Sequence, residues 1–166
     1  VGAGLMGSGI AQTAIVSGFK VTLNDQRVEA LNRAHDGIAK NLNREVEKGR
    51  MSQEDCDAAI ARLSTSASMQ PAKDADLLIE AIFENLDAKQ SVFKQLEEIC
   101  PPHTIFASNT SSISLTSLAA ATKRPSQVVG MHFFSPVPKM KLCEVIFGLL
   151  TAQDVLEEIQ HVGKKM

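Results

Sequence analysis

Apolar residues recur along the chain in two alternating spacings, one typical of helices and the other of buried strands. On the longest helical stretch, from about Arg27 to Lys48 before Gly49, one face carries Val28, Leu31, Ile38, Leu42 and Val46. Short apolar runs, typical of strands buried on both faces, occupy residues 21–23, 77–82, 105–107, 128–131 and 142–146. Such alternation with short links predicts an α/β domain with a mainly parallel sheet.

The remaining helices are predicted from their apolar spacing and start signals, at residues 8–17, after Ser52, and at 86–99, 115–121 and 151–160. Ser52 and Asp55 resemble a capping box, and Ala59, Ile60 and Leu63 would lie on the apolar positions of that helix. Thr151 with Asp154 is expected to cap the last helix. The helices at 27–48 and after Ser52 form a long hairpin. His35 lies on its apolar face, where packing is favoured over ligand binding.

The hexamer Gly2-Ala3-Gly4-Leu5-Met6-Gly7 fits the pattern G-x-G-x-x-G, in which backbone N–H groups reach a dinucleotide pyrophosphate at a helix N-terminus. Asp25 ends the next strand about 20 residues later, where a carboxylate binds ribose hydroxyls and repels a 2′-phosphate. This context favours a Rossmann-like, doubly wound domain that binds NAD over NADP. A glycine-rich surface turn beside an ordinary helix is the alternative.

The glycine turn needs a buried strand of about five apolar residues before it, and only Val1 is present. In a sheet of order 3-2-1-4-5-6 that first strand lies between two others. We therefore expect the sequence to be truncated at its N-terminus.

Composition bounds the class of protein. The net charge of −2 gives no basic footprint for nucleic acid or a membrane surface. Cys56, Cys100 and Cys143 are far apart and form no disulfide framework or zinc motif, and no apolar run approaches the roughly 18 residues of a membrane span. We expect one NAD-binding domain over residues 1–166, located in the cytoplasm.

His132 and Glu144 are the strongest candidates for chemistry. Each lies in an apolar strand, and Pro138 stands midway between them, so a reversal there places the two side chains opposite each other. Such a carboxylate raises the basicity of the imidazole and leaves its second nitrogen free to take a proton. A buried ion pair without a catalytic task is the alternative, and a metal site would need more ligands.

The polar run Ser108-Asn109-Thr110-Ser111-Ser112 follows a strand, at the sheet edge where doubly wound proteins bind ligands. Its hydroxyls could hold a substrate or the nicotinamide amide. No G-x-S-x-G pattern surrounds the serines, which disfavours acyl transfer. Helix capping by Ser112 or Ser114 is the alternative.

Four segments carry a resemblance to a known family: G-A-G-L-M-G-S-G-I-A-Q at 2–12, E-A-I-F-E-N-L at 80–86, S-N-T-S-S at 108–112 and G-M-H-F-F-S-P-V-P-K-M-K-L-C-E-V at 130–145. They resemble the NAD-binding domain of the L-3-hydroxyacyl-CoA dehydrogenases, most of all the bacterial 3-hydroxybutyryl-CoA dehydrogenases. The resemblance covers essentially the whole chain.

The resemblance implies a role for each matching residue. His132 would be the catalytic base, Glu144 its orienting partner, and Ser111 a contact to both substrate and cofactor. NAD would be bound by Gly2, Gly4, Leu5, Met6, Gly7, Asp25, Gln26, Ala81, Glu84, Lys89, Asn109, Ser111 and Ser135. The helical hairpin, including Asn41 and Lys48, would approach the CoA of an acyl-CoA substrate.

The chain departs from the family in two ways. Most members have Asn at the position of Ser135, which changes a contact near the nicotinamide more than the activity. The family also continues into a helical C-terminal domain for substrate binding and dimerisation, so the resemblance implies truncation at that end and a homodimeric full-length protein. Two alternatives stay open: another NAD(P)-dependent β-hydroxyacid dehydrogenase, which would use a lysine base, and a non-catalytic, crystallin-like family member.

Overall fold

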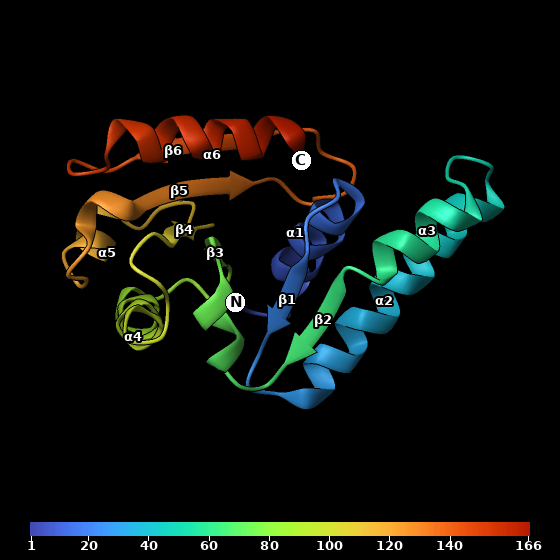
Figure 1. Cartoon of the computed structure of the whole chain (residues 1–166), viewed down its shortest axis with the longest axis horizontal. Helices are drawn as coiled ribbons and strands as arrows, with labels where there is room; N and C mark the ends of the chain where they lie inside the picture. Colours follow the sequence, from blue (N-terminus) through green and yellow to red (C-terminus); the bar gives the residue numbers. More distant parts are fainter.

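Strands and helices alternate along the chain, and helices cover both faces of the β structure (Figure 1). The computed structural model describes all of residues 1–166. Its strands are β1 (Val21–Asn24), β2 (Leu63–Ser66), β3 (Leu77–Glu80), β4 (Ile105–Ser108), β5 (Val128–Phe133) and β6 (Cys143–Phe147). Its helices are α1 (Leu5–Val16), α2 (Val28–Glu47), α3 (Gln53–Ile60), α4 (Leu86–Glu97), α5 (Leu115–Ala119) and α6 (Gln153–Lys165), with 3-10 turns η1 (Gln70–Asp74) and η2 (Pro125–Gln127).

The strands form two neighbouring sheets. β1 and β2 pair in parallel, while β3, β4 and β5 run parallel in a second sheet that β6 closes as an antiparallel edge strand. The start of the chain connects the two sheets, because the Gly2 N–H donates to the Asn24 carbonyl at 2.7 Å and the Ala81 N–H donates to the Val1 carbonyl at 2.8 Å. The predicted α/β class with a mainly parallel sheet is confirmed, and the glycine turn lies where the two sheets meet.

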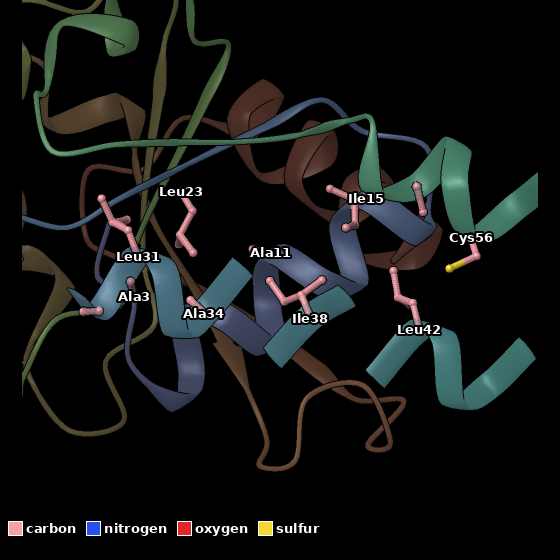
Figure 2. Packing of buried hydrophobic residues seen from close by; sticks show 11 residues of the cluster. Ala3, Ala11, Ile15, Leu23, Leu31, Ala34, Ile38, Leu42 and Cys56 are labelled. Atoms are coloured by element: carbon pink, nitrogen blue, oxygen red, sulfur yellow. The ribbon is translucent and has the colours of Figure 1, made fainter. Parts of the chain in front are cut away.

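The predicted helical hairpin after the first observed strand is also confirmed. Gly49 adopts a φ of +67° after α2, and the Ser52 hydroxyl accepts a hydrogen bond from the Asp55 N–H at 2.9 Å at the start of α3. The apolar face of α2 packs with α1, β1 and α3 around a core of 11 buried residues that includes Ile38 and Leu42 (Figure 2). In Figure 1 the hairpin runs beside β1 and β2 and projects beyond them.

Two further cores lie on opposite faces of the second sheet, since side chains alternate along each strand. Phe106 and Val128 face α4 and α5, where they join Phe93, Leu96 and Leu118. Ala107, Val129 and Met131 face the other way and pack with residues of α1 and α6, namely Ile10, Val155 and Ile159. Helices on both faces make the domain doubly wound. None of these helices has both the length and the apolar composition that a membrane span requires.

Two local predictions are wrong. Leu63 does not extend the helix after Ser52, because α3 ends at Ile60 and Leu63 begins β2, paired with Val21. The apolar pattern did not predict β2, because it is an edge strand whose Ser64 and Thr65 are exposed. Thr151 does not cap α6: its hydroxyl donates to the Val128 carbonyl at 2.7 Å and accepts from the Gly148 N–H, so it fastens the β6–α6 connection.

Candidate active site

The glycine-rich turn forms a backbone cradle at the start of α1. Gly2 has a φ of +99°, and a Cβ there would lie 2.7 Å from the Ala81 carbonyl oxygen. A Cβ on Gly7 would lie 1.7 Å from the Gly2 carbonyl oxygen, so this contact between turn and helix requires glycine. Nothing lies within 4 Å of the corresponding position at Gly4. The turn is closed on its protein side and open to a ligand at Gly4.

The N-terminus of α1 fits the pyrophosphate of a dinucleotide. Gly4 is its N-cap, no side chain caps the helix, and no acidic residue lies in the first turn. The first N–H groups of a helix have no intrahelical partner, and the helix dipole favours an anion there. Leu5, the first helical residue, is 77% exposed, which leaves the approach to these N–H groups open.

Asp25 follows β1 and holds the glycine turn in place. Its Oδ2 accepts a hydrogen bond from the Ala3 N–H at 2.9 Å, and its Oδ1 accepts from the Arg27 N–H at 2.9 Å. Burial opposes ionisation, but these hydrogen bonds and the Arg27 charge bring the pKa of Asp25 below its usual value. Asp25 is therefore an anion at neutral pH, and the neighbouring Gln26 is exposed.

His132 and Glu144 are directly opposite in the β5–β6 register, as predicted from the midpoint at Pro138. His132 Nδ1 lies 2.8 Å from Glu144 Oε2, whereas Nε2 has no partner in the protein. The Phe134 ring packs on the imidazole with centroids 4.7 Å apart. When Nδ1 donates to the carboxylate, Nε2 carries the free lone pair. The His132 side chain is 20% exposed, so a small molecule can reach it.

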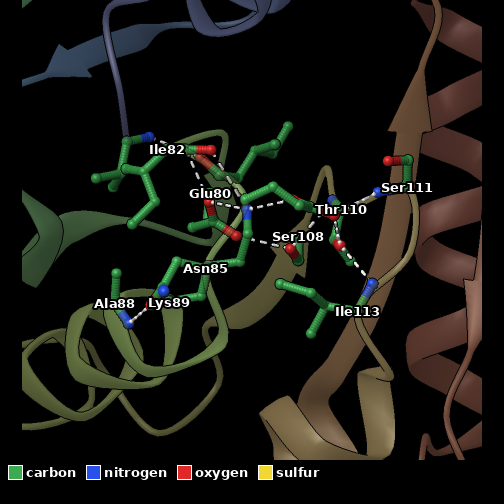
Figure 3. Close-up of polar contacts among 12 residues, drawn as sticks. Glu80, Ile82, Asn85, Ala88, Lys89, Ser108, Thr110, Ser111 and Ile113 are labelled. Carbon is green, nitrogen blue, oxygen red and sulfur yellow. Dashed lines mark hydrogen bonds and ion pairs between the residues drawn. The ribbon is translucent and has the colours of Figure 1, made fainter.

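A buried ionic cluster connects the ends of β3 and β4 to the start of α4 (Figure 3). Lys89 Nζ lies 2.7 Å from Glu80 Oε1 and 3.3 Å from Glu84 Oε2. The Lys89 and Glu80 side chains are 1% and 0% exposed, and the Ser108 hydroxyl donates to Glu80 Oε2 at 2.6 Å. Sequence reasoning missed Glu80, and it offered the Ser108 hydroxyl to a ligand, whereas that hydroxyl is bound by Glu80. The available signal was a carboxylate that ends the apolar run of β3.

Glu84 organises the loop that follows β4. Its Oε1 accepts hydrogen bonds from the Thr110 hydroxyl, from the Ser111 N–H at 3.1 Å and from the Ser112 N–H at 3.3 Å. Burial opposes ionisation, yet the Thr110 hydroxyl and the Lys89 charge lower the pKa of Glu84 to about 2. The loop therefore wraps around a carboxylate that stays charged, with Ser111 exposed at the surface.

The predicted site residues gather in two places. The first surrounds the glycine turn and contains Gly2, Gly4, Leu5, Met6, Gly7, Asp25, Gln26 and Ala81. The second lies at the ends of β3, β4 and β5 and contains Glu84, Lys89, Asn109, Ser111, His132 and, through β6, Glu144. Ser135 is exposed in the β5–β6 connection. The helix-capping alternative is confirmed for Ser114, whose hydroxyl accepts from the Ser117 N–H in α5.

Asn41 on α2 and Lys48, the residue that follows α2, lie apart from both groups. The Asn41 side chain donates to Gln12 Oε1 at 3.1 Å, and Lys48 is exposed with its Nζ 3.7 Å from Glu45 Oε1. Their contact with CoA, like the direct contact of the buried Lys89 with NAD, stays a prediction. No group of three or more His, Cys, Asp or Glu side chains is placed to hold a metal ion.

Comparison with known proteins identifies the type of domain. Residues 1–166 match the family model described as "3-hydroxyacyl-CoA dehydrogenase, NAD binding domain". A probable 3-hydroxybutyryl-CoA dehydrogenase of Bacillus subtilis is 48% identical over 99% of this chain, which spans 58% of that protein. A 3-hydroxyadipyl-CoA dehydrogenase of Escherichia coli is 46% identical over 96% of the chain, which spans 34% of it.

Solved structures agree with this assignment. The crystal structure of 3-hydroxybutyryl-CoA dehydrogenase from Escherichia coli K12 matches with a TM-score of 0.97 and 45% identity, covering 99% of this chain and 35% of that one. The enzyme of the same name from Ralstonia eutropha matches with a TM-score of 0.96 and 41% identity, covering 99% and 58%. The chain thus spans about one third to three fifths of the length of these relatives.

Proposed function

Because the chain belongs to the 3-hydroxyacyl-CoA dehydrogenase family, as its NAD-binding domain, we propose that the protein oxidises a short-chain L-3-hydroxyacyl-CoA, such as 3-hydroxybutyryl-CoA, to the 3-ketoacyl-CoA, or catalyses the reverse reduction. The single observation that carries the reaction is the 2.8 Å contact between His132 Nδ1 and Glu144 Oε2, with Nε2 free. This is the arrangement that a general base needs.

In this proposal His132 Nε2 accepts the proton of the 3-hydroxyl group. The imidazolium that results keeps its Nδ1–H on Glu144, whose negative charge stabilises it. The Phe134 ring limits rotation of the imidazole, so the basic nitrogen stays aimed in one direction. Bound NAD supplies the acceptor for the hydride that leaves C3. In the reverse direction His132 returns the proton to the keto oxygen.

NAD is the cofactor of this domain, and the residues present fit it. We propose that the open backbone at Gly4 and the start of α1 bind the pyrophosphate, while Asp25 binds the adenosine ribose. The ionised Asp25 would repel the additional phosphate of NADP, which favours NAD. Glu84 and Lys89 would contact the cofactor or hold the loop that does.

The acyl-CoA substrate has two candidate contact regions. Beside Ser111 lies an open hollow of about 460 Å³, lined by residues 110–116 and 146–149. Its exposed apolar side chains, including Phe147 and Leu149, suit an acyl chain. Asn41 on α2 and Lys48, directly after it, are proposed contacts for CoA. A homodimer located in the cytoplasm completes the proposal, and the two buried free thiols, Cys56 and Cys100, suit a reducing compartment.

The test measures NADH formation from 3-hydroxybutyryl-CoA by the whole protein. We expect His132→Gln to lower kcat by roughly 10² to 10⁴ while the Kd for NAD changes little. Glu144→Gln should also lower kcat, because the imidazolium formed during the reaction loses its anionic partner. A lysine-base dehydrogenase or a crystallin-like protein would show neither effect.

His103→Gln is the matched control. In the wild type, His103 Nε2 lies 3.3 Å from Asp76 Oδ1. This is also a histidine–carboxylate pair, but both side chains are exposed and lie outside the site. The variant should leave kcat unchanged. Wild-type protein without dehydrogenase activity would refute the proposed function, and a normal kcat in His132→Gln would refute the role of His132.

A further inference from the structure

The side chain of Asn109 bridges two strands at the point where their main chains separate. The parallel register of β4 with β5 ends at the pair Ser108 and Gly130, yet β5 continues to Phe133. Asn109 Oδ1 accepts a hydrogen bond from the Phe133 N–H at 2.8 Å. The Asn109 N–H in turn donates to the Glu80 carbonyl of β3 at 2.8 Å. One residue thereby connects the ends of β3, β4 and β5.

This hydrogen bond acts on the peptide next to His132. Phe133 is only 4% exposed, so its N–H needs a protein partner, and Asn109 provides it. On the other side of β5, Glu144 of β6 holds the imidazole at 2.8 Å. The end of β5 that carries His132 is therefore held on one side by the antiparallel pairing with β6 and the Glu144 side chain, and on the other side by the Asn109 side chain that follows β4.

The neighbouring hydroxyls do not share this task. Thr110 and Ser112 donate from their hydroxyls to Glu84, and the Ser108 hydroxyl donates to Glu80. Among the polar side chains of the 108–112 loop, only that of Asn109 reaches β5. Its oxygen is used internally, whereas its amide NH₂ has no partner in the protein.

We propose that Asn109 is a positioning residue for His132: by accepting the Phe133 N–H it fixes the end of β5, and hence the direction of the imidazole relative to Glu144. This inference rests on the proposed function for its catalytic consequence, while the positioning itself is a property of the fold. A displacement of about 1 Å in a catalytic group can cost about 10²-fold in rate, which sets the scale of the expected effect.

The experiment compares Asn109→Ala, Asn109→Asp and wild type in the whole protein. We expect Asn109→Ala to lower kcat by about 10- to 10²-fold, with the KM for substrate and the Kd for NAD within about threefold of wild type. Amide exchange at Phe133 should become roughly 3- to 10-fold faster, and that at Val129 should not change. Asn109→Asp keeps the acceptor oxygen, so it should keep Phe133 protected and exceed the Ala variant in kcat.

A second readout does not require turnover. The proton on His132 Nδ1, held by Glu144, should give a downfield NMR signal that weakens in Asn109→Ala and persists in Asn109→Asp. If the wild-type protein were inactive, the proposed dehydrogenase activity would be refuted. Loss of the signal in Asn109→Ala would still support the positioning role of Asn109. The two conclusions can thus fail separately.

Thr104→Val is the control for loss of a buried hydrogen bond. Thr104 lies just before β4, is 0% exposed, and donates to the Ala75 carbonyl at 2.6 Å. It should destabilise the protein without changing kcat or the Phe133 exchange rate. A normal kcat in Asn109→Ala, a lower kcat with Phe133 still protected, or a weaker NAD affinity with unchanged kcat would each overturn the proposal, the last showing a cofactor contact instead.

Discussion

Replacing Lys89 by Met removes the cation from a carboxylate that has no contact with solvent. Lys89 Nζ lies 2.7 Å from Glu80 Oε1, with side chains 1% and 0% exposed. At an effective dielectric constant of about 20 the Coulomb attraction is about 6 kcal/mol. Most of it offsets the cost of taking both charges out of water. Removing one partner leaves the other charge uncompensated, so we expect the free energy of unfolding to fall by about 3–5 kcal/mol.

The assay is urea unfolding at neutral pH of wild type, Lys89→Met, Glu80→Gln and the double variant. The double variant should recover most of the loss, because it buries no net charge. Lowering the pH should reduce the difference in unfolding free energy between wild type and Lys89→Met, since a protonated carboxyl is cheaper to bury than a carboxylate. Lys123→Met is the matched control. Its partner Glu98 lies 3.0 Å away, but both side chains are exposed, so the loss of unfolding free energy should be much smaller than in Lys89→Met.

Two results would refute this reasoning. One is a loss in Lys89→Met no larger than that in Lys123→Met. The other is a double variant no more stable than Lys89→Met, which would mean that the lost stability came from packing of the lysine stem rather than from the uncompensated charge of the buried Glu80.

Two further predictions concern the glycine turn and Glu84. Gly4→Ala should cost less than about 1 kcal/mol of stability, yet weaken NAD binding at least tenfold as measured by calorimetry. Gly7→Ala, in contrast, should destabilise the fold, because its Cβ would lie 1.7 Å from the Gly2 carbonyl oxygen. Unchanged NAD affinity in Gly4→Ala would contradict the proposal that the backbone at Gly4 binds the pyrophosphate. The pKa of Glu84 falls from the ordinary 4.5 to about 2, so its contribution to stability is present above pH 4.5 and is lost as the pH falls toward 2. Glu84→Gln should flatten the acid limb of the curve of unfolding free energy against pH, and identical curves would contradict this assignment.

Elements with a strong local pattern were predictable. The apolar face of α2, the stop at Gly49 and the Ser52 cap are each set by residues close in sequence. β2 was missed because its residues are polar and its place depends on pairing with β1, 42 residues earlier for Val21 and Leu63. The cap assigned to Thr151 failed for a related reason, since a carbonyl of distant β5 competes for its hydroxyl.

The site divides in the same way. The alternation of a strand and the midpoint at Pro138 were enough to place His132 opposite Glu144. The partners of Lys89 were not predictable in this way, because Glu80 and Glu84 reach it only when β3 and α4 pack together. Without that packing, a lysine on a helix is expected to be exposed.

By itself the sequence determined the α/β class, the glycine turn and the histidine–glutamate pair, because each follows from spacing along the chain and from the stereochemistry of single residues. Tertiary structure alone decided that Lys89 is buried against two carboxylates, that Glu84 gathers the loop around Ser111, and that Asn109 holds the end of β5. These contacts join segments 5 to 28 residues apart. Their strength comes from removing charges and N–H groups from water, which happens only when the strands and helices pack against one another.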